Sequence, residues 1–397
     1  MLYIHIPFCQ QRCIYCDFYS TTQSIDKALA YVHAAENEMR HRSKELPTTQ
    51  LSSVYIGGGT PSLLPHEAIR QLFCAVRTYF TLSEGAEITF EANPDDITPE
   101  LIDVLISVGV NRISLGVQSF NDQQLQLLRR RHTANQAIEA VHLIHRKGIP
   151  HISIDFIYGQ PQQTLASWDD DLKTALSLPV DHLSAYALSV EEATPLQRLI
   201  KSQTLSLPSD ETTWHMYQHL CEATRKHGFL HYEISNFCLP NAHSRHNSGY
   251  WQSRPYLGIG PGAHSYDGAS RHFNPLNLQD YINKQGITHR TTEVLSEAEQ
   301  CNEFVFTALR TSNGLNMDEF EKMVSSVVID CVSSNGYTTC MWHNLITSKI
   351  VLDKNGKLNE LQKKYQIKYP EKLKKNIVSN NLKLISGMLP SFDMQIK

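Results

Sequence analysis

The sequence predicts an α/β protein whose larger part is a parallel β-sheet, followed by a smaller C-terminal domain. Short apolar strands alternate with amphipathic helices six times within about the first two hundred residues. Repeated βα units imply parallel strands, because each crossover must return the chain to the same end of the sheet. Beyond Pro208 the alternation stops, which indicates a change of architecture. Six such units can form either a doubly wound sheet or a partial barrel.

The bulk properties are those of a globular chain without a strong charge. Its 397 residues are 41% hydrophobic and carry a formal net charge of −4, so charge gives no argument for nucleic-acid binding. The N-terminus lacks a basic stretch followed by an apolar one, and no run of about eighteen apolar residues suggests a membrane span. Six of the nine cysteines are scattered, and without a secretory context disulfides are not expected. We therefore expect a cytoplasmic protein.

The individual elements follow from apolar spacing and from helix end signals. We expect strands at 2–6, 53–56, 87–90, 112–117, 152–157 and 182–188. We expect the intervening helices at about 24–42, 65–79, 98–109, 133–148 and 168–176. Thr98 as the N-cap and Pro99 at the first position are typical of a helix start, and Gly109 is typical of a helix end. A helix at 210–227, a strand at 230–234 and a helix at 296–309 follow.

The change of pattern suggests three segments. Residues 1–235 would form the core with the ligand site, and 236–295 would form a polar, aromatic and glycine-rich extension. Residues 296–397 would form the C-terminal domain. Within that domain, 324–355 has the character of an insertion, which makes the domain atypical.

Three cysteines directly after the first strand are the most informative motif. Cys9, Cys13 and Cys16 have a C-x3-C-x2-C spacing. Three close thiolates can hold three corners of a 4Fe–4S cluster, and the fourth iron then remains open to another ligand. A structural zinc site needs four ligands, usually in paired short spacings, and no second C-x2-C follows. Zinc and unrelated structural cysteines are the alternatives to a cluster.

Glycines and polar residues stand where the other strands end. The Gly-Gly-Gly-Thr-Pro run at 57–61 would let backbone N–H groups approach a ligand closely, or it would simply form a tight turn. Glu91 and Asp155 stand toward the ends of later apolar strands, and Gln118 follows the strand at 112–117. A carboxylate at the end of an apolar strand needs a partner, which is either a ligand or a nearby Arg or Lys. Ligands of parallel sheets gather at this end of the strands.

Together these motifs resemble the radical S-adenosylmethionine (SAM) superfamily. The resemblance covers about residues 1–320 and implies a partial (βα)6 barrel, a 4Fe–4S cluster on the three cysteines, and SAM on the open iron. In that superfamily one electron cleaves SAM to methionine and a 5′-deoxyadenosyl radical, and the protein positions the cofactor. By the same resemblance the residues in contact with SAM would be Tyr3, Tyr15, Gly58, Gly59, Thr60, Glu91, Gln118, Arg130 and Asp155.

The resemblance extends to the branch that contains oxygen-independent coproporphyrinogen III dehydrogenase and the radical SAM heme chaperones. The matching stretches in this sequence are 3–9, 57–61, 91–94, 116–120 and 155–159. The dehydrogenases typically have a fourth cysteine two residues after the third, whereas the chaperones usually have an aromatic residue there. The residue here is Phe18. The chaperones also carry an H-N-x-x-Y-W motif implicated in heme binding, and this sequence contains it at 246–251.

That motif supplies the candidate heme site, formed by His246, Asn247, Tyr250 and Trp251. Imidazole is a common ligand of heme iron, and the aromatic rings could pack on the macrocycle. Read without the resemblance, the same six residues would be a turn with a packed tryptophan.

The predicted function is to bind heme and transfer it to a hemoprotein, which could be a respiratory one. The alternative is the dehydrogenase, which converts coproporphyrinogen III to protoporphyrinogen IX by oxidative decarboxylation. A third alternative is a non-catalytic iron–sulfur or zinc scaffold. Whether SAM is cleaved, and thus whether the chain is an enzyme, stays open at this point. The resemblance also implies an electron donor, is compatible with a homodimer, and gives no role to nucleic acid.

Overall fold

The computed structural model describes residues 1–22, 25–316 and 318–320, and the chain divides into two compact units. The first unit contains residues 1–294 and 310–313. Of the described residues, 295–309, 314–316 and 318–320 belong to the second unit. The predicted insertion at 324–355 lies outside the described residues. Everything that follows about the sheet and the candidate site concerns the first unit.

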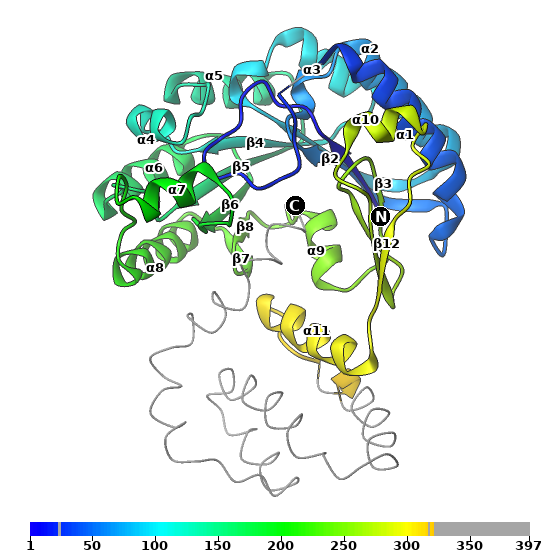
Figure 1. Ribbon diagram of the computed structural model, residues 1–397. Coiled ribbons are helices and arrows are strands. Elements are labelled where there is room, and N and C mark those ends of the chain that lie inside the picture. The colour runs from blue at the N-terminus through cyan, green and yellow to red at the C-terminus, as the bar shows by residue number, and fades with distance from the viewer. Residues whose placement is uncertain (23–24, 317, 321–397) are drawn as a thin grey trace, which may run out of the picture. The chain divides into compact units, whose positions relative to one another are not determined.

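A nine-stranded sheet is the centre of the first unit (Figure 1). Its strand order is β7-β8-β6-β5-β4-β3-β2-β1-β9. Strands β1 to β6 are parallel in sequence order, β9 adds to β1 in parallel, and β8 and β7 are antiparallel at the other edge. The strands are β1 (Leu2–Ile6), β2 (Gln50–Gly58), β3 (Thr81–Ala92), β4 (Arg112–Gln118), β5 (His151–Tyr158), β6 (His182–Ala187), β7 (Leu230–Glu233), β8 (Asn236–Cys238) and β9 (Leu257–Ile259). The six expected strands and their parallel order are confirmed, and the open sheet is a partial barrel.

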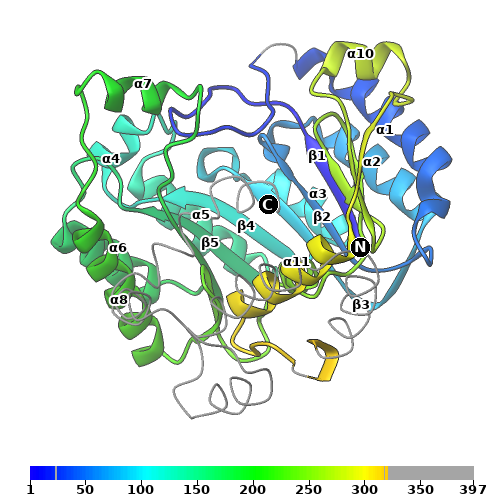
Figure 2. The same cartoon turned by 60° about the horizontal axis from the view of Figure 1, so that its bottom comes forward.

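Helices cover the convex side of this sheet (Figure 2). The helices of the first two hundred residues are α1 (Ala28–Arg42), α2 (His66–Tyr79), α3 (Pro99–Ser107), α4 (Asp122–Leu127), α5 (Ala134–Arg146), α6 (Leu165–Ser177) and α7 (Pro195–Lys201). The expected start signals are present, because Thr98 accepts a hydrogen bond from the Leu101 N–H and Thr133 forms a capping box with Gln136. Gly109 has the positive φ of 84° that the αL position after a helix requires. Helices α4 and α7 were not predicted from the sequence, since each has fewer than two full turns of pattern.

The two faces of the sheet differ in chemistry. Side chains alternate between the faces of a strand, so every second residue points to the convex side. On that side β2, β3 and β4 bury residues such as Val54, Phe90 and Leu115 against the helices. The residues between them are polar and face the concave side. They pair across the strands as Ser53 with Glu87, Tyr55 with Thr89, Thr89 with Arg112, Ser114 with Ser153, Ser153 with His182, and Asp155 with Ser184.

The region after residue 200 contains more regular structure than the sequence pattern predicts. Helix α8 (Asp210–Lys226) and β7 correspond to the expected elements. The H-N-x-x-Y-W stretch is a helix, α9 (Arg245–Trp251), and not a turn. The unpredicted elements that follow are a small antiparallel sheet and one helix, β10 (His264–Tyr266), β11 (Ser270–Phe273), α10 (Leu278–Asn283) and β12 (Thr291–Val294).

Helix α11 (Glu297–Arg310), which lies in the second unit up to Leu309, corresponds to the helix expected at 296–309. Cys301 and Val305 pack against Phe320 in a small apolar cluster of this unit. Within the described part of the chain, no helix is both long enough and apolar enough to cross a membrane.

Candidate functional site

The cysteine loop follows β1 at the carboxyl end of the parallel strands and is held at its stem by backbone hydrogen bonds. Cys9 N–H donates to the Thr21 carbonyl at 2.9 Å, and Thr21 N–H donates to the Pro7 carbonyl at 2.7 Å. At its far side Ile14 N–H donates to the Leu128 carbonyl at 3.3 Å. Ile14 is also buried, so an apolar anchor fixes the middle of the loop. The backbone is therefore fixed at the stem and in the middle of the loop, while the three cysteines stay partly exposed.

Each cysteine lies beside a hydrogen-bond donor. Arg130 Nη1 donates to Cys13 Sγ at 3.4 Å, and the Thr60 hydroxyl donates to Cys9 Sγ at 3.5 Å. Burial first, and the neighbouring Cys13 second, raise the pKa of the Cys16 thiol to about 12, against the lowering effect of a backbone hydrogen bond from Phe18. Burial also raises the pKa of Cys9, against the lowering effect of Thr60. Thiols in this setting need a cation to become thiolates, which is what iron would supply.

Tyr15 and Arg130 lie beside the same thiol. Burial raises the pKa of the Tyr15 phenol well above its usual value, and Cys13 is the next cause. Arg130 Nη2 donates to the Asn93 side-chain oxygen and to the Gly116 carbonyl, each at 2.6 Å. One guanidinium therefore joins the cysteine loop to the ends of β3 and β4.

The glycine run after β2 packs so closely against the stem of the cysteine loop that larger residues would collide with it. Gly59 N–H donates to the Ile6 carbonyl at 2.7 Å, and a Cβ at Gly59 would lie 2.6 Å from the Phe8 carbonyl oxygen. A Cβ at Gly58 would lie 2.6 Å from the His5 ring, and Gly58 has a φ of 108°. The run thus lies against the stem of the cysteine loop. The tight-turn alternative and the ligand-approach alternative are both compatible with this geometry.

The two carboxylates are hydrogen-bonded on the concave side. Glu91 accepts from the Tyr55 hydroxyl at 2.6 Å and from Gly58 N–H at 3.1 Å. Asp155 is buried and accepts from the Ser114 hydroxyl at 3.0 Å. Burial raises the pKa of Tyr3 well above its usual value and the charge of Glu91 raises it further, so Tyr3 lies close to Glu91.

Gln118 has an unusual backbone conformation at the end of β4. Its φ of 68° is in the left-handed region, which costs a non-glycine residue about 1–2 kcal/mol. Two neighbours that were not predicted from the sequence stabilise this turn. Gln160 Nε2 donates to the Gln118 carbonyl at 3.0 Å, and the Asp171 carboxylate accepts from the Ser119 hydroxyl at 2.9 Å and from Phe120 N–H at 2.6 Å. The only sequence signal was a carboxylate on the buried face of a helix.

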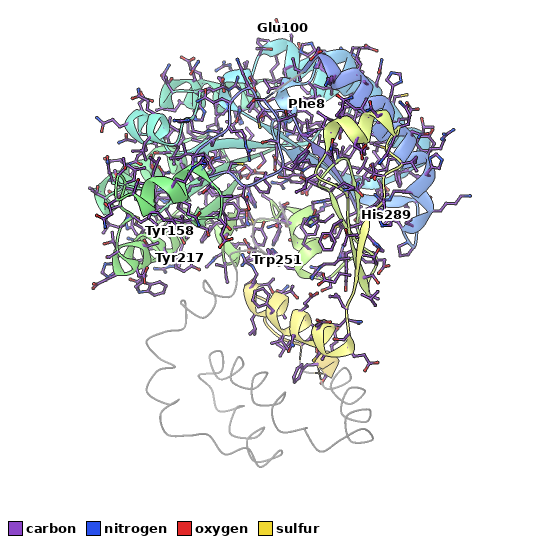
Figure 3. The ribbon with its side chains drawn as sticks, viewed as in Figure 1. Phe8, Glu100, Tyr158, Tyr217, Trp251 and His289 are labelled. Atoms are coloured by element: carbon purple, nitrogen blue, oxygen red, sulfur yellow. The ribbon has the colours of Figure 1, made fainter. Side chains whose placement is uncertain are left out.

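The H-N-x-x-Y-W helix lies at the amino-terminal ends of the strands, away from the cysteine loop. Figure 3 labels Phe8, in the stem of that loop, and Trp251, on α9. His246 is 1% exposed, with Nδ1 2.9 Å from the Ser53 hydroxyl and Nε2 2.9 Å from the Tyr250 hydroxyl. Burial lowers the pKa of His246 to about 3. The imidazole is therefore neutral, and both ring nitrogens are hydrogen-bonded.

Glu87 positions α9. Its carboxylate accepts from the N–H groups of Arg245 and His246, each at 2.9 Å, at the start of the helix. The same carboxylate forms a buried ion pair with Arg112, with Nε 3.0 Å from Oε2. A carboxylate at a helix N-terminus satisfies N–H groups that have no partner within the helix. This contact explains why seven residues that include a glycine form a helix.

The predicted residues therefore form two groups. Around the carboxyl end of the strands lie Cys9, Cys13, Tyr15, Cys16, Gly58, Gly59, Thr60, Glu91, Gln118 and Arg130. Tyr3 lies within β1 and Asp155 within β5, where Asp155 lines the same small cavity as His246. At the amino end lie His246, Asn247, Tyr250 and Trp251. Tyr55 links the groups, since its hydroxyl donates to Glu91 and its ring centroid is 5.1 Å from that of His246.

The donor set of the cysteine loop fits an iron–sulfur cluster. It offers three partly exposed thiols, of which Cys13 is close enough to raise the pKa of Cys9 and of Cys16, with Arg130 beside them to offset the negative charge of a thiolate-bound cluster. In the described ranges no group of three or more His, Cys, Asp or Glu side chains is spaced to hold a single metal ion. The cysteine loop therefore matches an iron–sulfur cluster in the type and the number of its donor atoms.

Comparisons with known proteins agree with this geometry. Residues 3–175 match the radical SAM superfamily. The chain is 37% identical over 320 residues to the heme chaperone HemW of Lactococcus lactis, covering 80% of this chain and 83% of that protein. It is 36% identical over 325 residues to HemW of Bacillus subtilis, covering 80% and 85%. Among solved structures it resembles the coproporphyrinogen III oxidase HemN of Escherichia coli, a radical SAM enzyme, with 26% identity, a TM-score of 0.70, and 81% and 77% coverage.

These relatives span most of the chain, and the E. coli oxidase shares the fold described above. This chain therefore belongs to the radical SAM superfamily, in the family of the heme chaperones HemW.

Proposed function

We propose that this protein is a cytoplasmic heme chaperone that binds heme and delivers it to a recipient hemoprotein, a respiratory one being a candidate. The observation that carries the proposal is that one compact unit contains both the three-thiol loop and the intact H-N-x-x-Y-W helix. The named activity of the HemW relatives supports it.

Cys9, Cys13 and Cys16 would hold the 4Fe–4S cluster, which when bound supplies an open iron and a single electron for SAM. On the protein side, Arg130 balances the charge of the thiolates and Glu91 and Asp155 offer acceptors to SAM hydroxyl or ammonium groups. Gly58, Gly59 and Thr60 would approach the methionine end of SAM, and Tyr3, Tyr15 and Gln118 complete the proposed contacts. An electron donor and a homodimer remain part of the proposal without a contact assigned to them.

Heme would use the concave side and α9. Because both nitrogens of His246 are already hydrogen-bonded, its use as an axial ligand would require release from Ser53 and Tyr250. Trp251 lies under the Arg310 guanidinium, 4.3 Å from the ring centroid, which is a cation–π contact. We therefore propose that the motif shapes the heme site through its packing, with Asn247, Tyr250 and Trp251 as the contacts.

The alternative function is oxygen-independent coproporphyrinogen III dehydrogenase. The likeness to the E. coli oxidase favours it, whereas Phe18 in place of a fourth cysteine favours the chaperone. The fold does not separate the two activities, since one fold can support either.

The test uses one anaerobically reconstituted sample of the full chain in two assays. The first measures conversion of coproporphyrinogen III with SAM and a reductant, and the second measures heme binding and its transfer to an apo-hemoprotein. The proposal predicts stoichiometric heme binding and transfer without porphyrinogen conversion. Robust conversion would overturn it, and analysis of iron, sulfide and zinc on the same sample tests the scaffold alternative.

A further inference from the structure

Asp171, on α6, is a buried carboxylate that accepts hydrogen bonds from neutral groups. Its side chain is 2% exposed and accepts from the Ser119 hydroxyl at 2.9 Å and from Phe120 N–H at 2.6 Å. Within the described residues it forms no ion pair with a Lys, Arg or His. Burial, and to a smaller extent the charge of Asp170, raise its pKa to about 6, against those two hydrogen bonds. A buried carboxylate without a counter-charge is costly, and the packing of a helix does not require one.

Both donors belong to the turn that follows Gln118. Gln118 has a φ of 68°, and β4 contains one residue more than β5 at this point, between the pairs Gly116 with Asp155 and Gln118 with Phe156. A left-handed backbone at a non-glycine residue persists only where surrounding contacts hold it. Because Asp171 accepts from the next two residues of the chain, it holds the backbone that presents Gln118.

The Ser119 hydroxyl carries this contact to α4. While it donates to Asp171, its oxygen accepts from Asn121 N–H at 3.0 Å. Asn121 is the N-cap of α4, and its side-chain oxygen accepts from the N–H groups of Gln123 and Gln124 at 2.9 and 3.2 Å. A helix of six residues is unstable by itself, so α4 depends on contacts of this kind at its start.

The far end of α4 meets the cysteine loop. The Leu128 carbonyl accepts from Ile14 N–H at 3.3 Å. Arg130 N–H donates to the Leu125 carbonyl at 2.8 Å, which ties this arginine to the helix, and Arg130 Nη1 donates to Cys13 Sγ at 3.4 Å. Residues 118–130 therefore form one connected segment, with Asp171 at its base and the cysteine loop at its far end.

We propose that Asp171 is a positioning residue for SAM and the cluster, which sets Gln118 through residues 119 and 120 and sets Arg130 through α4. The inference rests on the proposed function, because Gln118 and Arg130 are proposed contacts of SAM and Arg130 lies beside a cluster cysteine. It adds to that function a residue on α6 that acts through its neighbours.

The experiment measures SAM affinity by equilibrium dialysis on the anaerobically reconstituted full chain, with heme titrated by absorbance on the same sample. Asp171→Ala leaves two buried donors without an acceptor and should weaken SAM binding about tenfold or more, because only part of the protein then keeps the turn. Asp171→Asn has the same size and keeps one acceptor oxygen, so it should lose only about threefold. Heme binding should not change in either variant.

The matched control is Asp169→Ala on the same helix, since Asp169 pairs with Lys173 and His219 and makes no contact with the turn. It should keep the wild-type affinity for SAM. Ser119→Ala breaks the link to α4 and should weaken SAM binding about three- to tenfold. Combined with Asp171→Ala, the two losses should not multiply, because both variants break the same contact. Ser119→Ala and Asp171→Asn carry the test if Asp171→Ala does not fold.

The contribution through α4 has a separate readout, the reduction potential of the cluster measured by redox titration without SAM. A positive charge beside the cluster favours its reduced form, so displacement of Arg130 in Asp171→Ala should make the potential more negative. A potential equal to that of the wild type would overturn the part of the inference that concerns Arg130.

Wild-type SAM affinity in Asp171→Ala would overturn the inference, and so would an equal loss in Asp169→Ala or a parallel loss of heme binding. These results would leave SAM binding by the wild type, and with it the proposed function, standing. If the wild-type protein binds no SAM, the proposed SAM site fails and the inference fails with it.

Discussion

The two ends of the parallel strands are built on opposite principles. At the carboxyl end, a loop anchored at its base leaves three thiols partly exposed, with donors beside them. At the amino end, α9 closes the concave side, and Glu87, Arg112 and His246 are buried and hydrogen-bonded. The contrast teaches that a motif associated with a ligand, here the H-N-x-x-Y-W helix, can also have a structural role by packing against the concave side of the sheet.

The largest effect is expected from the cysteines of the open end. Cys13→Ser should reduce iron and sulfide after anaerobic reconstitution to background, because two cysteine ligands cannot hold the cluster as three do. Cys74→Ser is the matched control, since Cys74 is exposed on α2 and should leave the iron content unchanged. Iron bound at the wild-type level in Cys13→Ser would disprove the assignment of the cluster to this loop.

The buried ion pair of the closed end should matter most for stability. Glu87→Gln is expected to lower the free energy of unfolding by about 3–5 kcal/mol, because it leaves Arg112 buried without its counter-charge. Asp103→Asn, in an exposed pair with Lys147, should change it by less than about 1 kcal/mol. Urea unfolding followed by circular dichroism measures both. Similar small effects for the two variants would mean that α9 does not depend on Glu87.

Two glycines with positive φ allow the cost of a steric contact to be distinguished from the cost of the backbone conformation alone. Gly58→Ala should destabilise the protein by roughly 3 kcal/mol, because a left-handed backbone and a contact with the His5 ring act together. Gly85→Ala adds a Cβ in open space at a φ of 65° and should cost only about 1 kcal/mol. The same unfolding measurement applies, and equal costs would show that the packing of the cysteine-loop stem against Gly58 is unimportant.

The buried imidazoles predict a gradual loss of stability in acid. Burial lowers the pKa values of four histidines to about 3 or 4, namely His5, His132, His246 and His264. The unfolded chain binds protons at these groups below about pH 6.5 whereas the folded chain does not, so stability falls as pH drops below that value. Each contributes at most about 1.4 kcal/mol per pH unit.

Buried carboxyls such as Asp171 oppose this trend. Burial raises the pKa of Asp171 to about 6, so the folded state gains a proton there before the unfolded state does. Thermal melts between pH 7.5 and 5 should show a falling melting temperature, with a shallower slope in His246→Gln. A slope that the substitution leaves unchanged would show that His246 is not held neutral by the fold.

The open end could be predicted from the sequence more fully than the closed end. The cysteine loop, the glycine run and Glu91 depend on short local patterns, and each lies at the predicted end of its strand, whereas Asp155 lies in the middle of β5. The polar concave lining was missed because strands such as 53–56 and 152–157 were recognised by their apolar residues alone. Their alternate Ser, Tyr and Asp residues were the signal that could have revealed it.

Helix α9 could not be predicted in this way. A helix of seven residues is unstable by itself, and this one depends on Glu87, which is more than 150 residues away in the chain. The role of Asp171 at the Gln118 turn could not be predicted for the same reason, because its contact with Phe120 spans 51 residues and leaves no local sequence pattern. The three-segment division and the contacts of the predicted residues with SAM and heme stay predictions.

The most direct test of the contrast between the two ends is a parallel titration of heme and SAM on one variant. In the full chain with Cys9, Cys13 and Cys16 all changed to serine, equilibrium dialysis measures SAM and absorbance measures heme, with circular dichroism to verify the fold. The account predicts that SAM binding is lost while heme still binds at a ratio near the wild-type one. Loss of both ligands from a folded variant, or retention of SAM, would contradict it.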